Sequence, residues 1–331
     1  MMSKLKFSFA CTPYDRMFAL IDGTVSPMGL DFNFIALDVE EIFWRMIKHQ
    51  EFDASEMSLS SYIMAKSRGD DSFIAIPIFT SRMFRHSFIF FNTNKGISKP
   101  VDLKGKIIGV PEYQMTAALW IRGMLQHEYG VYPKDVKWRS GGEENPGREE
   151  KIKLQLPYEI DYQAIPKDKT LSHMLETGEI DALVSARPPS CFSNGSPNVS
   201  RLFTNYAEVE REYYRKTGIF PIMHTVVIKR SVYDKNPWVA MELFKACRAA
   251  KDFRLKKLKE WAALHSTLPW LVSEVERTIE IMGEDWWPYG IDDNRLTLET
   301  MCDYSYEQGL AAKRMRVEEL FAPETFNEFK I

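Results

Sequence analysis

The sequence lacks several features that would assign it to a broad functional class. It has no excess of positive charge, because 43 basic residues are balanced by 46 acidic ones, and it has no basic stripe or RNA-binding motif. We therefore expect no nucleic-acid partner. No stretch approaches the ~18 consecutive apolar residues that span a bilayer, so we also expect no membrane partner.

Cysteine is scarce and widely spaced. The four cysteines are Cys11, Cys191, Cys247 and Cys302, and no two of them form the close pairs typical of zinc sites or redox motifs. This spacing favours reduced thiols over a disulfide framework. The apolar stretch LKFSFA near the N-terminus is shorter than the roughly 7–15 residues of a signal-peptide core. Together these features predict a cytoplasmic protein.

What the sequence does contain is an alternation of strand-like and helix-like segments, which favours an α/β fold. Apolar strand patterns at 5–11 and 73–79 alternate with helical patterns such as 39–50. From Pro237 onward the chain is predicted to be mostly helical, in about four helices. The segment 141–157 is polar and punctuated by glycine and proline, and we predict that it is an exposed loop.

One strand–turn–helix segment is a candidate site for an anionic ligand. The strand IIGV runs into the turn PEYQ and then into a helix that begins at Thr116. The N–H groups at a helix N-terminus lack partners within the helix and carry partial positive charge. We therefore predict that Tyr113, Gln114 and Thr116 contact a ligand.

Polar residues also follow other predicted strands, and open α/β sheets bind ligands at the carboxyl ends of their strands. Arginine at such a position suits a carboxylate, because the planar guanidinium binds both carboxylate oxygens. The candidates are Arg16, Arg82, Arg85 and Arg187, with Ser58, which is also expected to cap a helix. An ordinary surface position is the alternative for Arg16 and Arg82.

Six segments, spread in order over most of the chain, carry a resemblance to known proteins. They are TPYDR (12–16), SRMFRHSFIFFN (81–92), GVPEYQMTAALWIRGML (109–125), GEIDALVSARPP (178–189), TGIFPIMHTVVIKR (217–230) and EDWWPYGIDDNRLTLE (284–299). Together they resemble the 4,5-dihydroxyphthalate decarboxylase family. The order of the predicted elements resembles the type II periplasmic-binding-protein fold.

The resemblance implies a two-lobed α/β fold of the type II periplasmic-binding-protein kind, with two crossover segments and a helical C-terminal region. The crossovers are expected near 84–90 and 221–228. Lobe 1 would combine residues 1–86 with 226–331, and lobe 2 would comprise 87–225. The ligand would bind in the cleft between the lobes.

The resemblance further implies non-oxidative decarboxylation of a hydroxylated aromatic acid, most directly 4,5-dihydroxyphthalate to protocatechuate and CO2. Such a reaction needs an acid near the ring carbon, and histidine suits that task. Because both crossovers line the cleft in this fold, His86 and His224 are expected to converge there as catalytic residues, with Glu56 at a neighbouring strand end. Only one of Arg85 and His86 should face the cleft directly, since adjacent strand residues alternate. Hydrogen-bonded scaffold is the alternative for both histidines.

We predict no metal and no cofactor, although two histidines with Glu56 could in principle bind a divalent ion. The expected partners are a small aromatic carboxylate and further copies of the chain, as a homo-oligomer. Apolar positions of the C-terminal helices would cover lobe 1 or form a dimer interface; examples are Leu296, Leu298, Met301 and Leu310.

Two alternatives to the decarboxylase hypothesis stay open at this point. One is a solute-binding receptor for an aromatic or dicarboxylic acid. The other is a different cytosolic enzyme on the same scaffold. Arginine and histidine at strand ends suit either enzyme hypothesis.

Overall fold

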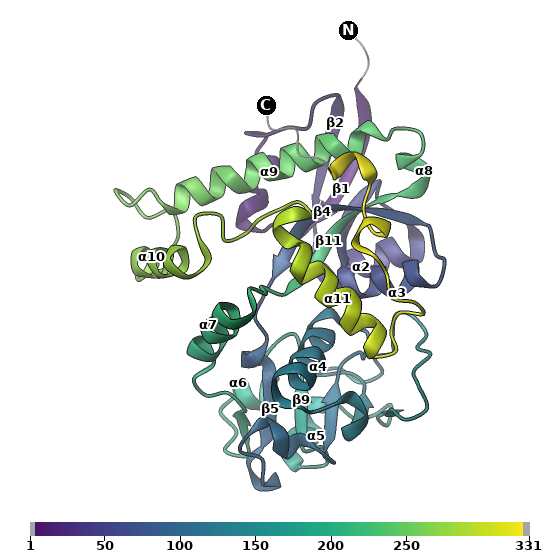
Figure 1. Cartoon of the computed structure of the whole chain (residues 1–331), viewed down its shortest axis with the longest axis vertical. Coiled ribbons are helices and arrows are strands. Elements are labelled where there is room, and N and C mark those ends of the chain that lie inside the picture. Colours follow the sequence, from purple (N-terminus) through teal and green to yellow (C-terminus); the bar gives the residue numbers. More distant parts are fainter. Residues whose placement is uncertain (1–3, 327–331) are drawn as a thin grey trace.

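The computed structural model describes residues 4–326. It contains two sheets, each covered by helices, and the two lobes lie one above the other in Figure 1. The chain leaves the first sheet after Arg82 and enters the second at Ile89; it leaves the second after Arg201 and returns to the first at Ile222. The lobe boundaries expected from the sequence stay predictions.

The first sheet has the strand order β2-β1-β3-β11-β4. Strand β1 is parallel to β2 and β3, whereas β11 is antiparallel to both of its neighbours. The strands are β1 (Leu5–Cys11), β2 (Leu30–Ala36), β3 (Ala54–Ser58), β4 (Phe73–Arg82) and β11 (Ile222–Lys229). Because β11 enters from the second lobe, it sets residues of the returning chain beside the ends of β3 and β4.

The helices of the first lobe are α1 (Phe18–Ile21), α2 (Val39–His49) and α3 (Leu59–Ser67). The predicted amphipathic pattern of α2 is confirmed, because Ile42, Phe43 and Met46 are buried. Helix α3 begins directly after β3, where the Ser58 side chain accepts a hydrogen bond from the Ser61 N–H. The carboxyl end of β3 therefore leads directly into the N-terminus of a helix.

The second sheet has the order β10-β5-β9-β6-β7-β8. Its strands are β5 (Ile89–Asn92), β6 (Ile107–Val110), β7 (Lys137–Ser140), β8 (Asp161–Ala164), β9 (Ala182–Val184) and β10 (Val199–Arg201). Its helices are α4 (Thr116–Tyr129), α5 (Leu171–Thr177), α6 (Ser190–Ser193) and α7 (Tyr206–Thr217). The sequence pattern does not predict α7, because Tyr213 is the one residue of this helix that is buried.

The C-terminal region of the described chain is helical, as expected, but from Pro237 onward it has three α-helices instead of about four. After α8 (Arg230–Tyr233) come α9 (Trp238–Leu258), α10 (Leu271–Met282) and α11 (Arg295–Glu307). Helix α9 extends across the first lobe (Figure 1). Leu298, Met301 and Leu310 are buried within the chain, whereas Leu296 is exposed. None of the helices among residues 4–326 combines the length and apolar character needed to cross a membrane.

Helix α11 ties the two lobes together, because it contacts α3 in one lobe and α4 in the other (Figure 1). A Cβ atom on Gly123 of α4 would lie 2.0 Å from the Tyr304 ring of α11, so only glycine permits this approach. Arg122 Nε donates to Gln308 Oε1 at 2.7 Å, and Trp120 Nε1 donates to the Ile222 carbonyl at 2.9 Å. These buried contacts fix the position of α4 relative to β11 and hence the shape of the cleft between them.

Candidate active site

A cleft of about 280 Å³ lies between the lobes, where the ends of β3 and β4 and the start of β11 meet the start of α4. Six of the residues predicted from the sequence line it. They are Ser58, Arg85, Gln114, Thr116, Arg187 and His224. The carboxyl group of Glu56 lies behind the wall that His224 forms.

His224 and Glu56 form a hydrogen-bonded pair at this sheet edge. In the antiparallel pairing of β11 with β3, His224 lies opposite Ser58, and Glu56, two residues earlier on β3, shares the face of Ser58. His224 Nδ1 is 2.7 Å from Glu56 Oε1. Because an ionised carboxylate only accepts hydrogen bonds, Nδ1 carries the proton. The Nε2 atom of the cleft-lining ring is therefore the one available to a ligand.

Several donors keep Glu56 ionised although it is 0% exposed. Its carboxylate accepts from Tyr14 Oη at 2.8 Å, Thr80 Oγ1 at 2.9 Å and the Thr12 N–H at 3.2 Å. Burial alone would raise the pKa of Glu56, but the hydrogen bond and charge of His224, with the other donors, lower that pKa below its ordinary value. A buried anion thus orients the imidazole of His224 through its Nδ1 proton.

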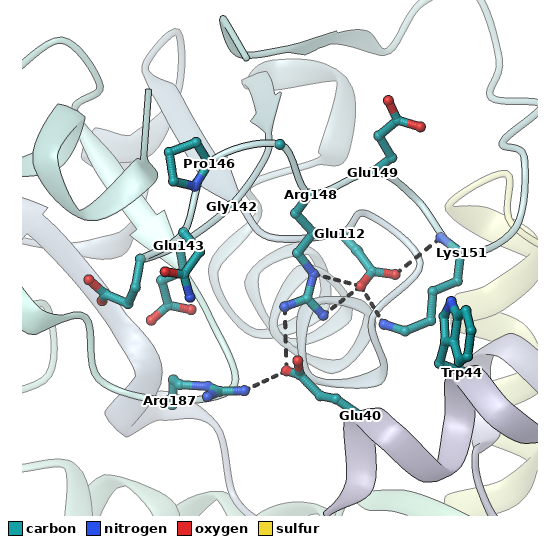
Figure 2. A pocket seen from close by; sticks show the side chains of 13 residues that line it. Glu40, Trp44, Glu112, Gly142, Glu143, Pro146, Arg148, Glu149, Lys151 and Arg187 are labelled. Carbon is teal, nitrogen blue, oxygen red and sulfur yellow. Dashed lines mark hydrogen bonds and ion pairs between the residues drawn. The ribbon is translucent and has the colours of Figure 1, made fainter. Parts of the chain in front are cut away.

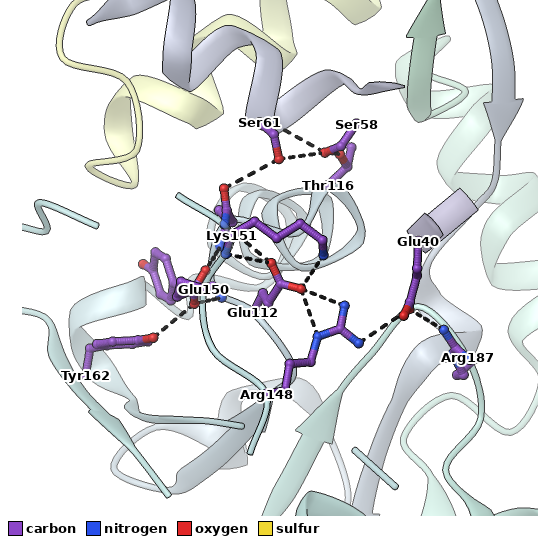
Figure 3. A network of polar contacts seen from close by, with 12 residues as sticks. Glu40, Ser58, Ser61, Glu112, Thr116, Arg148, Glu150, Lys151, Tyr162 and Arg187 are labelled. Atoms are coloured by element: carbon purple, nitrogen blue, oxygen red, sulfur yellow. Dashed lines mark hydrogen bonds and ion pairs between the residues drawn. The ribbon is translucent and has the colours of Figure 1, made fainter. Parts of the chain in front are cut away.

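The N-termini of two helices meet at the cleft, one from each lobe. Ser58 Oγ lies 2.9 Å from Thr116 Oγ1, so the residue before α3 is joined to the first residue of α4 (Figure 3). The Ser61 hydroxyl is 3.1 Å from Ser58 Oγ and also lines the cleft. Helix N-termini carry partial positive charge, which favours an anionic ligand at this point.

Arg85 brings a buried positive charge to the cleft wall. Its Nη1 donates to the Ala186 carbonyl at 3.1 Å, and its Nε lies 3.3 Å from Met223 Sδ. Both partners are uncharged, and no carboxylate among residues 4–326 forms an ion pair with Arg85. Burial lowers the pKa of Arg85, yet a guanidinium stays protonated at neutral pH. The Glu210 carboxylate acts on Arg85 through its charge but forms no ion pair with it. A buried cation without a directly bonded carboxylate is costly, so an anionic ligand would complement it.

The turn before α4 does not offer its N–H groups to a ligand, in contrast to our expectation. The Tyr113 N–H donates to Glu150 Oε1 at 2.5 Å, and the Gln114 N–H lies 3.4 Å from Glu150 Oε2. The Tyr113 ring is buried, 3.7 Å from the Arg122 guanidinium, and does not line the cleft. The protein's own carboxylate therefore fills the anion site that the turn creates, although Gln114 still lines the cleft.

His86 lies outside the cleft, so the expected convergence of two histidines does not occur. It is 1% exposed and packs edge-on against Phe203 at 5.3 Å and Tyr213 at 5.2 Å between ring centroids. Neither ring nitrogen has a hydrogen-bond partner among the described residues. Burial lowers the pKa of His86 to about 4. His86 is therefore a neutral packing residue, while its neighbour Arg85 is the one that lines the cleft.

Arg16 and Arg82 also have structural contacts in place of cleft positions. Arg16 Nε donates to the Thr80 carbonyl at 2.8 Å, and its guanidinium lies over the Tyr14 ring at 4.1 Å. Arg82 donates to the Asn294 side chain, to the Pro288 carbonyl at 2.9 Å and to the Phe220 carbonyl at 3.3 Å. Neither arginine lines the cleft. Both instead attach neighbouring segments to β4. A position at a strand end fits this role as well as ligand binding, so the sequence does not separate the two.

A cluster of charged residues forms the opposite wall and continues into an adjoining cavity of about 450 Å³ (Figure 2). Glu112 is 2% exposed, and its Oε1 accepts from Arg148 Nη2 at 2.6 Å and Lys151 Nζ at 2.5 Å. Arg148 Nη1 also lies 3.4 Å from Glu40 Oε1, and the same Glu40 oxygen pairs with Arg187 Nη2. Three cations and two carboxylates therefore share this wall.

The segment 141–157 is not merely the exposed loop that its composition predicts. It folds back to the cleft and supplies Arg148 and Lys151. Gly142 allows this fold, because a Cβ atom there would lie 1.6 Å from the Asn145 carbonyl oxygen. Polar composition cannot distinguish a solvated loop from one that lines a polar cleft, so the sequence holds no signal for these two residues.

Among the other cleft residues that the sequence did not predict, Tyr14 and Glu40 show why such residues are missed. Tyr14 lies within the TPYDR segment, which carries part of the family resemblance, so that motif was the available signal. Glu40 is in the first turn of α2, where an acidic residue is common because it interacts favourably with the helix dipole. That ordinary context conceals its contact with the other lobe.

Glu143 is a buried carboxyl group in the wall of the larger cavity. Its Oε2 accepts from the Ser185 hydroxyl, whereas its Oε1 is buried without a partner among residues 4–326. Burial raises the pKa of Glu143 to about 7, against the opposing effects of the Ser185 hydrogen bond and of Arg187. The charge of this wall therefore changes near neutral pH.

The described residues contain no group of three or more His, Cys, Asp or Glu side chains placed to hold a metal ion. His86 packs in its aromatic surroundings and does not join the Glu56–His224 pair. The alternative of a divalent ion bound by two histidines and Glu56 therefore has no geometric support.

Comparison with known proteins adds evidence that the geometry alone cannot supply. The chain is 41% identical over 330 residues to the 4,5-dihydroxyphthalate decarboxylase of Comamonas testosteroni, and the match covers 100% of both chains. It is 44% identical over 214 residues to the 4,5-dihydroxyphthalate decarboxylase of Pseudomonas putida, which covers 65% of this chain and 83% of that protein. No model of a known protein family matches the chain.

Solved structures confirm the predicted fold. The periplasmic aliphatic sulphonate binding protein SsuA from Escherichia coli superposes with a TM-score of 0.54 at 12% identity, covering 98% of this chain and 99% of that one. A ligand-binding component of an ABC-type import system from Staphylococcus aureus gives a TM-score of 0.54 at 11% identity, with coverage of 98% and 99%. At such identities the likeness establishes the fold alone. The full-length relative establishes the family: this chain belongs to the 4,5-dihydroxyphthalate decarboxylases, on a two-lobed, type II periplasmic-binding-protein-like fold.

Proposed function

We propose that this protein removes CO2 from 4,5-dihydroxyphthalate and releases protocatechuate, with the reaction taking place in the cleft between the lobes. The observation that carries the proposal is the presence, in one cleft, of a carboxylate-held imidazole and a buried arginine that no carboxylate of residues 4–326 binds in an ion pair. His224 lines this cleft beside Arg85. One group can give a proton and the other can hold an anionic substrate.

Binding begins with the carboxylates of the substrate. Arg85 and the N-terminus of α3 offer positive charge to one carboxylate, and Ser58 and Thr116 offer hydroxyl groups. The part of the cleft next to His224 is less polar, since Phe43 packs edge-on against its ring at 5.0 Å and Met223 lines the same wall. A carboxylate that enters such surroundings loses hydration, and its departure as neutral CO2 removes that cost.

The chemical step is a proton transfer to the ring carbon that bears the departing carboxylate. Each carboxylate of 4,5-dihydroxyphthalate is para to one hydroxyl group, which donates electron density to that carbon. Protonated His224 gives its Nε2 proton to the carbon, and the ring loses its aromaticity. The C–CO2 bond then breaks, its electron pair returns to the ring, and His224 regains a proton from water. Positioned acids of this kind contribute about 10²–10⁴-fold to a rate.

Glu56 acts through His224 as a positioning residue. Its buried, ionised carboxylate accepts the hydrogen bond of the Nδ1 proton and so holds the ring with Nε2 toward the cleft. Tyr14 and Thr80 in turn hold Glu56. This arrangement resembles the orienting carboxylate of other acid–base pairs, in which the carboxylate fixes the tautomer and stays ionised.

The proposal includes a cytoplasmic location and a homo-oligomeric state. The first is supported by the four cysteines, which are all buried and free. The second is supported by exposed apolar side chains of the connection between α9 and α10, namely Trp261, Leu264, Leu268 and Trp270. Sedimentation of the purified protein would test the oligomeric state directly.

The test of the activity is a discontinuous assay with chelator-treated protein and 4,5-dihydroxyphthalate, with products separated by chromatography. We expect protocatechuate and CO2 in equal amounts, and no product from phthalate, which lacks the activating hydroxyl groups. No product from 4,5-dihydroxyphthalate, with or without added divalent ions, would contradict the proposal. Turnover of a different hydroxylated aromatic acid in its place would identify another enzyme on this scaffold.

A further inference from the structure

Glu40 stands out in the charged wall because it is the member that comes from the first lobe. It lies on α2, while Glu112, Arg148, Lys151 and Arg187 belong to segments of the second lobe. In Figure 2 the Glu40 carboxylate points at the guanidinium groups of Arg148 and Arg187, and its Oε1 pairs with both. A carboxylate of the protein thus bridges two arginines across the cleft.

We propose that Arg148 and Arg187 form a subsite for the second, retained carboxylate of an aromatic dicarboxylate, and that Glu40 occupies this subsite until the substrate displaces it. The inference rests on the proposed function, because it assumes that the first carboxylate binds near Arg85 and His224. It assigns Glu40 a role in specificity: a ligand must bring a second carboxylate to replace the one that leaves the arginines.

The two carboxylates of the wall differ in the way that this role requires. The Glu112 side chain is 2% exposed and is held by three side-chain hydrogen bonds from Arg148 and Lys151 and by the Lys151 N–H, so it is a fixed counter-ion. The Glu40 side chain is 46% exposed and bonds to nothing but the two arginines among the described residues. Figure 3 shows Glu112 inside the network and Glu40 at its edge. Solvent-exposed ion pairs are weak, so Glu40 can be displaced at small cost.

The surroundings also keep Glu40 ionised, as a competitor for a carboxylate must be. Burial alone would raise the pKa of Glu40, but the charges of Arg148, Arg187 and Lys151 lower it below its ordinary value. When Glu40 leaves, Arg187 loses its one ion-pair partner among residues 4–326, and Arg148 keeps Glu112. The position that the Glu40 carboxylate leaves then has a net positive charge. A monocarboxylate held at Arg85 has no second carboxylate to place there.

The experiment compares equilibrium binding of phthalate and benzoate, by calorimetry at fixed ionic strength, to the wild-type protein and to Glu40→Gln. Neither ligand carries the hydroxyl groups needed for reaction, so binding is measured without turnover. We expect Glu40→Gln to bind phthalate about fivefold more tightly, the size of one exposed ion pair, with benzoate binding unchanged. Glu41→Gln is the matched control, because Glu41 pairs with Arg45 at 2.8 Å on the same helix, away from the cleft.

A second variant, Arg187→Met, should reduce the preference for phthalate over benzoate. Equal shifts for the two ligands in Glu40→Gln, or weaker phthalate binding, would overturn the proposed subsite. These outcomes are separate from the activity: selective tightening in a protein that fails to decarboxylate 4,5-dihydroxyphthalate would retain the subsite and reject the proposed function. Turnover without selective tightening would reject the subsite alone.

Discussion

His224 and His86 both lie where the chain passes between the lobes, yet their surroundings have little in common. His224 lines a cleft, and a buried carboxylate 2.7 Å from Nδ1 holds its ring. His86 is enclosed by Phe203 and Tyr213, and neither of its nitrogens has a partner among residues 4–326. Burial lowers the pKa of His86 to about 4, which leaves the ring neutral near neutral pH.

The difference shows that the groups around a histidine determine whether its ring can act as an acid. An imidazole can act as an acid near neutral pH when an ionised group stabilises its charged form and solvent or substrate can reach the other nitrogen. The environment of His224 supplies an ionised partner at one nitrogen and a cleft at the ring, whereas that of His86 supplies neither. The first two predictions below each test one side of this contrast, and the others test the groups that surround the cleft.

The largest effect is expected where His224 and Glu56 act as a unit. His224→Gln should lower kcat about 10³-fold with little change in KM, since it removes the proton donor. Glu56→Gln should also lower kcat, and the double variant should be no slower than His224→Gln alone, because the carboxylate acts through the imidazole. A double-mutant cycle on kcat measures this. Additive losses would show that Glu56 has a role independent of His224.

The next effect is the dependence of stability on pH that comes from His86. Its pKa of about 4 in the folded state lies below the ordinary 6.5, so the unfolded chain binds a proton that the folded protein excludes. The free energy of unfolding should therefore fall as pH drops from 6.5 to 4, by about 3 kcal/mol from this group. His86→Phe should remove that part of the loss in urea unfolding at several pH values. Identical pH dependence in both proteins would contradict the assignment.

Two neighbouring arginines allow a matched test that distinguishes a substrate-binding role from a structural one. Arg85→Met should raise KM about 10- to 100-fold, because it removes a buried charge-assisted contact with the substrate. Arg82→Met should leave KM unchanged but reduce the free energy of unfolding by about 1–3 kcal/mol, since Asn294 and the Pro288 carbonyl lose their donor. Steady-state kinetics and chemical unfolding of both variants distinguish the roles. A larger rise of KM in Arg82→Met than in Arg85→Met would reverse the assignment.

The smallest predicted effect comes from Glu143 in the cavity wall near Arg187. Because its pKa is raised to about 7, Glu143 is neutral below that pH and negative above it. A dianionic substrate should therefore bind a few-fold more weakly at pH 8 than at pH 6, since the added negative charge repels it. Glu143→Gln should flatten this dependence of KM on pH. A KM profile unaltered by the substitution would exclude Glu143 as its cause.

Much of the fold follows from local sequence patterns. Strand β1 and helix α2 match their predicted ranges closely, because apolar periodicity is strong where one face is buried. Helix α7 was missed, since it lies on the surface and buries little. Reasoning from strand ends also located part of the site, because Ser58, Arg85 and His224 stand at strand ends that the topology brings together.

The remaining site residues depend on tertiary contacts that no local pattern reports. Arg148 and Lys151 reach the cleft through a loop whose composition is typical of solvent-exposed segments. Arg82 has the same strand-end context as Arg85, but a side chain of the C-terminal region, Asn294, occupies it. Sequence reasoning can thus indicate which strand ends meet, but not which of their polar residues the rest of the chain already satisfies.

The central claim is that the histidine paired with Glu56, and not the one enclosed by aromatic rings, serves the reaction. The most direct measurement is the single-turnover rate of protocatechuate formation by His224→Gln and His86→Phe, side by side with the wild type at saturating 4,5-dihydroxyphthalate. We expect His86→Phe to stay within about threefold of the wild-type rate, and His224→Gln to be slower by at least about 10²-fold. Near-wild-type turnover by His224→Gln, with a matching circular dichroism spectrum, would contradict the account.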